Sequence, residues 1–147
     1  MSKRPLLTII IAFLLIFNCA VLSVAKENTL ADLDHLYAQR AQSPGIVDQL
    51  RRTIESELKE KPGSYELLWR MARVYMYMGD NAGSSGEKLR LYEQGKEYAE
   101  KAVAANQEGY EGYYYLGVLI GSVGQERGIM NSLFMVNPMK NALERCL

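Results

Sequence analysis

One stretch of the sequence decides the fold: Tyr98-Ala-Glu-Lys-Ala-Val-Ala-Ala-Asn-Gln-Glu-Gly-Tyr-Glu-Gly-Tyr-Tyr-Tyr-Leu-Gly117. Its first part continues a long run in which apolar residues recur at helical spacing, ending near Ala105. A short polar segment follows, and a second apolar helical pattern begins at Tyr110. The stretch therefore predicts two consecutive helices joined by a tight turn.

Three glycines indicate that this pattern belongs to a repeat. Gly45 and Gly79 lie 34 residues apart, and Gly124 follows 45 residues later, as one further 34-residue unit with an insertion of 11. Each glycine closes an apolar periodic segment. A bulky and a small residue stand eight and seven positions before each glycine, as Tyr37-Ala38, Met71-Ala72 and Leu116-Gly117. Such a unit fits a helical hairpin, because the small residue lets the two helices approach closely.

In these features the sequence resembles the tetratricopeptide repeat family over residues 31–124. In that frame Ala102 is the small residue of one second helix, and Leu116-Gly117 is the pair in the next first helix. Residues 57–72 follow the same frame. The resemblance extends to exported bacterial proteins of this kind, some of them linked to tripartite solute transporters. Three positions depart from the pattern and put the tight packing of individual hairpins in question: Glu57, Gln107 and Gly95.

The expected fold class is all-α, an antiparallel helix-hairpin α-solenoid with about three hairpins plus a C-terminal helix. Apolar periodicity, the capping-box spacing of Ser84 and Glu87, and the restriction that Pro44 places on its neighbour set the boundaries. We expect helices at residues 30–42, 46–60, 64–78, 86–105, 110–123, 126–134 and 138–147.

The C-terminal helix leaves three outcomes open. Asn137-Pro138 is typical of a helix start. The residues that follow form one apolar stripe, namely Met139, Ala142, Leu143, Cys146 and Leu147. A terminal solenoid helix needs an outer face that tolerates water. The helix therefore folds back onto Ile129, Leu133 and Phe134, or its stripe meets a partner or a second copy, or the chain is a shortened version of a longer protein.

The composition disfavours catalysis and metal binding. Seventeen Lys and Arg balance 17 Asp and Glu, and there are one His and two Cys among 147 residues. A net charge of zero lacks the basic footprint of sequence-independent nucleic-acid binding. His35 has no second His or Cys at ligand spacing. We therefore expect no enzyme, no metal, no cofactor and no nucleic-acid partner.

Residues 1–25 have the pattern of a secretory signal peptide. Lys3 and Arg4 precede an apolar run over residues 6–22, and Ser23 and Ala25 supply the small residues before a cleavage site. An uncleaved membrane anchor and a lipoprotein acylated at Cys19 are the alternatives. All three place the helical domain, residues 26–147, outside the cytoplasm. We therefore expect an exported protein that is periplasmic or associated with the envelope.

The resemblance also implies a binding groove. In the family, the first helices of successive repeats line a concave groove that binds extended peptides or small ligands. Carried onto this sequence, the groove contains Glu66, Trp69, Arg73, Tyr77 and Tyr114, with Met76, Glu111, Val118, His35 and Gln39 as further positions. Trp69 and Arg73 are one turn apart, so they face one ligand or stack on each other. Glu66 is two turns from Arg73, which predicts that Arg73 is available to a carboxylate.

Packing offers a second interpretation of the same aromatic residues. A Trp in such a repeat more often packs between hairpins than contacts a ligand, and shifting the frame by one residue would send Trp69 into the core. Tyr113-Tyr114-Tyr115 cover most of a helix circumference, so at least one ring must be buried. We expect Tyr113 and Leu116 in the core and Tyr114 in the groove.

These observations predict an exported helical-repeat protein that binds a peptide or a partner protein in its concave groove. The alternative is a small-ligand carrier associated with a solute-uptake system, which the transporter-linked resemblance suggests. Membrane contact is expected only through the N-terminal segment, if that segment is uncleaved, and the C-terminal helix is a candidate surface for self-association.

Overall fold

The computed structural model describes residues 30–146, apart from the side chains of residues 44 and 129–132. Within that range the chain forms α-helices joined by short turns and contains no strand. Residues 30–38 are helical and are followed by α2 (Pro44–Glu60), α3 (Tyr65–Asp80), α4 (Ser85–Ala105), α5 (Tyr110–Glu126) and α6 (Ile129–Glu144). The all-α expectation is confirmed. The predicted signal peptide or anchor in residues 1–25 lies outside the described residues.

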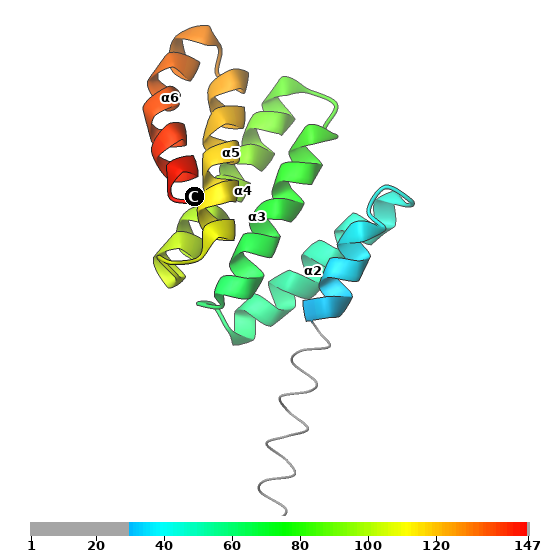
Figure 1. Ribbon diagram of the computed structural model, residues 1–147. Helices are drawn as coiled ribbons and strands as arrows, with labels where there is room; N and C mark the ends of the chain where they lie inside the picture. The colour runs from blue at the N-terminus through cyan, green and yellow to red at the C-terminus, as the bar shows by residue number, and fades with distance from the viewer. Residues whose placement is uncertain (1–29, 147) are drawn as a thin grey trace, which may run out of the picture.

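The helices pair into three hairpins. The first hairpin joins residues 30–38 to α2, the second joins α3 to α4, and the third joins α5 to α6. Figure 1 shows them side by side along the molecule, from the N-terminal hairpin in blue to the C-terminal hairpin in red. Neighbouring helices in the chain pack together, and α3 also packs on α5, the first helix of the next hairpin. This arrangement is that of an α-solenoid, in which each unit contacts its neighbours.

The core follows the bulky and small positions of the repeat. Met71 and Ala72 are fully buried, as are Ala99 and Ala102 on α4. Leu33, Leu50 and Ile54 of the first hairpin pack with Leu67, Met71 and Val74 of α3. Tyr92 and Ala99 of α4 pack with Leu119 and Val123 of α5. Small residues therefore lie where helices approach, and large apolar residues fill the space between hairpins.

Gly95 tightens its hairpin, contrary to the expectation from the family pattern. A Cβ at this position would lie 3.1 Å from Leu119 Cδ2 and 3.1 Å from Tyr75 Cβ. Tyr75 also stacks on Tyr98 of α4, with ring centroids 5.6 Å apart. The glycine therefore permits α3 and α5 to approach α4 closely.

The repeat glycines do not all end helices. Gly79 is the next-to-last residue of α3 and is buried, and Gly124 is buried inside α5. At Gly79 a Cβ would lie only 2.4 Å from the ring of Tyr92. This glycine therefore permits close packing of α4 on α3.

The two predicted C-terminal helices are one helix. α6 runs through Pro138, so the expected helix start at Asn137-Pro138 is wrong. Pro138 is exposed, so the distortion that a proline causes inside a helix faces solvent and not a packed neighbour. The stripe residues Met139 and Leu143 lie against Gly121 and Gly117 of α5. The helix thus packs on α5, and Leu133 and Phe134 stay 63% and 74% exposed, so the outcome in which it folds back onto them, one of the three left open, does not occur.

Candidate functional site

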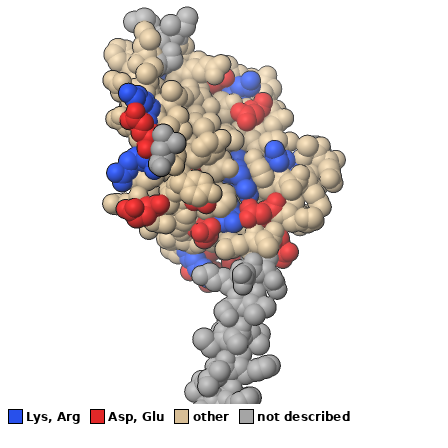
Figure 2. Space-filling view, viewed as in Figure 1, with Lys and Arg blue, Asp and Glu red and all other residues tan. Residues whose placement is uncertain are grey.

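The five predicted groove residues lie on the first helices of the second and third hairpins. Glu66, Trp69, Arg73 and Tyr77 are on α3, and Tyr114 is on α5. Residues 30–38, α3 and α5 together form a surface that we call the first-helix face. Figure 2 shows acidic and basic side chains lying close together on the side of the molecule in view, with uncharged atoms between them.

A network of charged groups joins the first hairpin to the second. Asp34 accepts hydrogen bonds from Arg70 Nε at 3.1 Å and Arg70 Nη2 at 2.6 Å, and from Arg73 Nη2 at 2.6 Å. Glu66 accepts hydrogen bonds from Arg70 Nη1 at 2.6 Å and from the indole N–H of Trp69 at 3.1 Å. The Arg70 side chain is 8% exposed and the Asp34 side chain 40% exposed. Two arginines therefore share one carboxylate near the surface.

This geometry sets the protonation state of Asp34. Burial alone raises the pKa of the Asp34 carboxyl, but hydrogen bonds and positive charge from Arg70 and Arg73 outweigh it and hold the pKa below its usual value. Burial alone lowers the pKa of Arg70, but hydrogen bonds and negative charge from Asp34 and Glu66 outweigh it and raise the pKa. Both partners therefore stay charged at neutral pH.

Aromatic rings enclose the arginines. The Arg73 guanidinium lies 3.9 Å from the ring centroid of Tyr37 and 5.0 Å from that of Trp69. Trp69 stacks on Tyr115 of α5 with centroids 6.0 Å apart and an interplanar angle of 4°. Tyr77 meets Tyr37 edge to face at 6.3 Å. Rings and cations therefore link all three hairpins.

The predicted role of Arg73 as a free cation is wrong. Arg73 is bonded to Asp34, and its side chain is only 14% exposed. Asp34 lies 39 residues earlier in the chain, so spacing on α3 alone could not identify it. We expected Trp69 and Arg73 either to face one ligand or to stack on each other, and the structure shows the stacking. Trp69 is 7% exposed and packs between hairpins, as the packing interpretation expected.

The tyrosine run is distributed differently from the prediction. Tyr114 is 47% exposed, as expected for a groove residue. Tyr115 is the ring that packs in the core, against Trp69 and Leu119, and burial raises its pKa to about 12. Tyr113 is half-buried beneath the guanidinium of Arg145, at 5.3 Å. The expectation that Tyr113 belongs to the core is therefore wrong.

Asp34 and Arg70 were missed by the sequence analysis. A signal was present, because Arg70 is the one charged residue in the run Leu67-Leu-Trp-Arg-Met-Ala72. A charge at a buried helical position requires a partner. That requirement points to an acidic residue on a neighbouring helix without indicating which one.

The described residues contain no group of His, Cys, Asp and Glu that could hold a metal ion. His35 instead contacts the side-chain nitrogen of Gln39 at 2.9 Å. In residues 30–146 we also find no helix long and apolar enough to cross a membrane.

The sequence of this domain matches a known family. The sequence model described as "Regulator of microtubule dynamics protein 1-3" matches residues 29–147. The chain belongs to this family. The earlier resemblance to exported bacterial tetratricopeptide proteins linked to transporters is therefore corrected, although the helical-repeat architecture stands.

Two relatives support membership of the regulator of microtubule dynamics family. Regulator of microtubule dynamics protein 1 of Bos taurus is 27% identical over 122 residues, covering 82% of this chain and 36% of the relative. Regulator of microtubule dynamics protein 3 of Xenopus laevis is 29% identical over 82 residues, covering 56% of this chain and 18% of the relative. The chain thus spans about a third or less of these relatives.

The family also corrects the predicted location. Both relatives are proteins of animals, whose cells have no periplasm. The expectation of a bacterial protein exported to a periplasm or envelope is therefore wrong. The carrier alternative loses the transporter-linked resemblance on which it rested.

Proposed function

We propose that this domain is a non-enzymatic protein-binding module whose first-helix face binds a polypeptide partner. The observation that carries the proposal is the network that fixes this face across three hairpins. Asp34 joins the first hairpin to Arg70 and Arg73 of the second, and Trp69 stacks on Tyr115 of the third. Side chains held in this way lose little conformational entropy when a partner binds.

Three side chains of the network remain accessible to a partner. The carboxylate-bearing side chains of Asp34 and Glu66 are 40% and 48% exposed. Tyr114 is 47% exposed and rests edge to face on Tyr115, with centroids 5.1 Å apart. An exposed tyrosine on a rigid support is suited to anchor an interface, since aromatic residues contribute strongly to binding energy there.

The names of the relatives suggest which partner to test first. Both are called regulators of microtubule dynamics. We therefore propose a protein of the microtubule system as the partner, with tubulin in assembled microtubules as the first candidate.

Co-sedimentation of the full chain with stabilised microtubules tests this proposal. We expect saturable binding that Tyr114→Ala weakens by roughly tenfold, the effect of losing an interface anchor worth 1–2 kcal/mol. Phe134→Ala is the matched control. Phe134 is a 74% exposed aromatic residue on α6, the second helix of the third hairpin, and so lies outside the first-helix face. Equal loss in the two variants would move the interface off the first-helix face. No binding by the unmodified chain would exclude assembled microtubules as the partner.

A further inference from the structure

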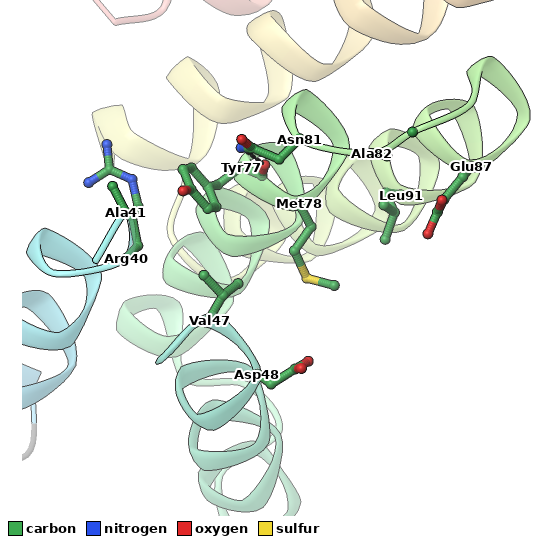
Figure 3. Close-up of a pocket in the computed structure, with 11 residues that line it drawn as sticks. Arg40, Ala41, Val47, Asp48, Tyr77, Met78, Asn81, Ala82, Glu87 and Leu91 are labelled. Carbon is green, nitrogen blue, oxygen red and sulfur yellow. Dashed lines mark hydrogen bonds between the residues drawn. The ribbon is translucent and has the colours of Figure 1, made fainter. Parts of the chain in front are cut away.

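A second surface lies between the second helices of the first two hairpins. Figure 3 shows a hollow there, with Val47 and Asp48 of α2 on one side, Met78 of α3 in the middle, and Glu87 and Leu91 of α4 on the other side. The hollow has a volume of about 440 Å³. This is in the range of cavities that hold a ligand or part of a peptide.

Two more hollows continue the first one. The next, of about 310 Å³, shares Asp48, Met78 and Leu91 with it and adds Arg51 and Arg90. The third, of about 370 Å³, is lined by residues of all three helices, including Lys59, Leu68 and Lys101. From hollow to hollow the lining residue numbers rise along α2 and α4 and fall along α3. The three hollows therefore follow one another along these helices, the third without sharing a lining residue with the other two, and we call the row the α2–α4 furrow.

The furrow has an apolar floor below charged walls. α2 and α4 both pack on α3, and the hollows lie over α3 between them. The floor's accessible apolar side chains are those of Met78 of α3 at one end and Tyr98 of α4 at the other, both half-buried, whereas Tyr75 and Leu91 between them are buried. Asp48 and Lys59 mark its length along α2, which is about 17 Å at 1.5 Å per residue. A segment of about three helical turns would fill it.

The walls carry more positive than negative charge. Five cations line the furrow, Arg40, Arg51, Lys59, Arg90 and Lys101, against the three anions Asp48, Glu55 and Glu87. The furrow therefore has a net charge of +2 in a chain whose charges balance. Arg51 is paired with Glu55 at 2.5 Å. The other four cations make no ion pair within residues 30–146.

These cations are distributed from one end of the furrow to the other. Arg40 lies over the rings of Tyr37 and Tyr77, and its buried Nε has no hydrogen-bond partner in the described part of the chain. Lys101 lies 5.1 Å from the ring centroid of Tyr98. Arg90 bonds only to the uncharged side chain of Gln94. Carboxylates of a bound segment could therefore pair with a cation at each end and in the middle.

We propose that the α2–α4 furrow binds an acidic amphipathic segment of a partner protein, with apolar side chains on the floor and carboxylates on the walls. The mode is that of a helix in a groove. A flat anionic membrane fits the furrow less well, because its surface would meet the wall cations without reaching the recessed apolar floor. This surface is distinct from the first-helix face, so the two proposals stand independently.

Fluorescence anisotropy with the full chain tests the proposal. The probe is a fluorescein-labelled twelve-residue peptide with Leu at helical spacing and Glu at the other positions, and the control probe replaces Glu with Lys. We expect saturable binding of the Glu peptide alone. Lys59→Gln combined with Lys101→Gln should weaken it roughly five- to tenfold, since two exposed ion pairs are worth about 1–1.4 kcal/mol together.

The matched control is Arg52→Gln combined with Lys88→Gln. These cations lie on the same two helices but do not line the furrow. The proposal is overturned if both double variants weaken binding equally, if the Lys peptide binds as well as the Glu peptide, or if neither binds. It is also overturned in favour of a membrane surface if phosphatidylserine vesicles bind through Lys59 and Lys101 while the Glu peptide does not.

Discussion

At the scale of single residues, Asp34 compensates two largely buried cations, Arg73 and, together with Glu66, Arg70. Arg70 is 92% buried as a side chain, and the carboxylate of Asp34 receives two of its hydrogen bonds. Asp34→Asn keeps the shape of the side chain and removes the charge. We expect a loss of about 2–3 kcal/mol in the free energy of unfolding, because hydrogen bonds to charged groups contribute about that much. Urea unfolding followed by circular dichroism measures it, and the exposed Asp32→Asn is the control.

The pH dependence of this effect follows from the lowered pKa of Asp34. A lowered folded-state pKa means that the stabilisation is fully present above the unfolded value of 3.8 and is lost as pH falls through the folded value. The difference between the unmodified chain and Asp34→Asn should therefore be constant near neutrality and shrink below about pH 4. A difference that stays constant down to pH 2 would show that Asp34 acts through packing alone.

The sequence predicted which residues of the candidate site share α3, but not their contacts with other helices. Helical spacing alone puts Glu66, Trp69, Arg73 and Tyr77 on adjacent turns of α3. The partners of Arg73 and Trp69, Asp34 and Tyr115, lie on other helices 39 and 46 residues away. Periodicity reports which face a residue occupies, whereas the partner across an interface depends on how helices are placed in space. The prediction of a free Arg73 failed for this reason.

At the scale of the helices, predicted boundaries were accurate where capping residues and turns agree. The predicted helix 86–105 and the observed α4 differ by one residue, and Ser84 accepts a hydrogen bond from the Glu87 backbone N–H as its spacing predicted. The prediction failed at α6 because Asn137-Pro138 has the local pattern of a helix start. The helix nevertheless continues through the proline, and Met139 and Leu143 beyond it lie against α5.

The packing of α3 against α4 provides a prediction at this scale. A Cβ at Gly79 would lie 2.4 Å from the ring of Tyr92, which is 6% exposed and donates a hydrogen bond to Asp80 at 2.8 Å. The ring has little freedom to move. Gly79→Ala should therefore lower the free energy of unfolding by about 2–3 kcal/mol, as overpacked cores do.

Gly86→Ala is the matched control for this prediction. Gly86 lies in the first turn of α4, and no heavy atom lies within 4 Å of the position that its Cβ would take. The same substitution there should leave stability unchanged or raise it by up to about 0.5–1 kcal/mol, because alanine favours the helix. Melting temperatures measured side by side test the contrast. Equal shifts in the two variants would mean that the contact with Tyr92 has no energetic weight.

At the scale of the whole molecule, tyrosines connect helices along the solenoid. Tyr65 of α3 donates a hydrogen bond to Glu111 of α5 at 2.7 Å, and Tyr92 of α4 donates one to Asp80 of α3. Tyr115 of α5 stacks on Trp69 of α3. Burial, with the neighbouring carboxylates, raises the pKa of Tyr65 and of Tyr92 to about 12. Burial also raises the pKa of Tyr115 to about 12.

These three phenols should couple ionisation to unfolding of the whole domain. A raised folded-state pKa means that their contribution to stability is complete below the unfolded value of 10 and is lost as pH rises toward 12. Because the chain has ten tyrosines, only the last part of the rise in tyrosinate absorbance at 295 nm should come from these three, and the helix signal at 222 nm should fall together with that part, between the two values. Tyr115→Phe keeps the stacked ring but cannot ionise, so its midpoint should move to higher pH, whereas the exposed Tyr114→Phe should leave the midpoint in place. Complete tyrosinate formation near pH 10 with an unchanged helix signal would contradict this coupling, because it would mean that the solenoid holds together without these three contacts.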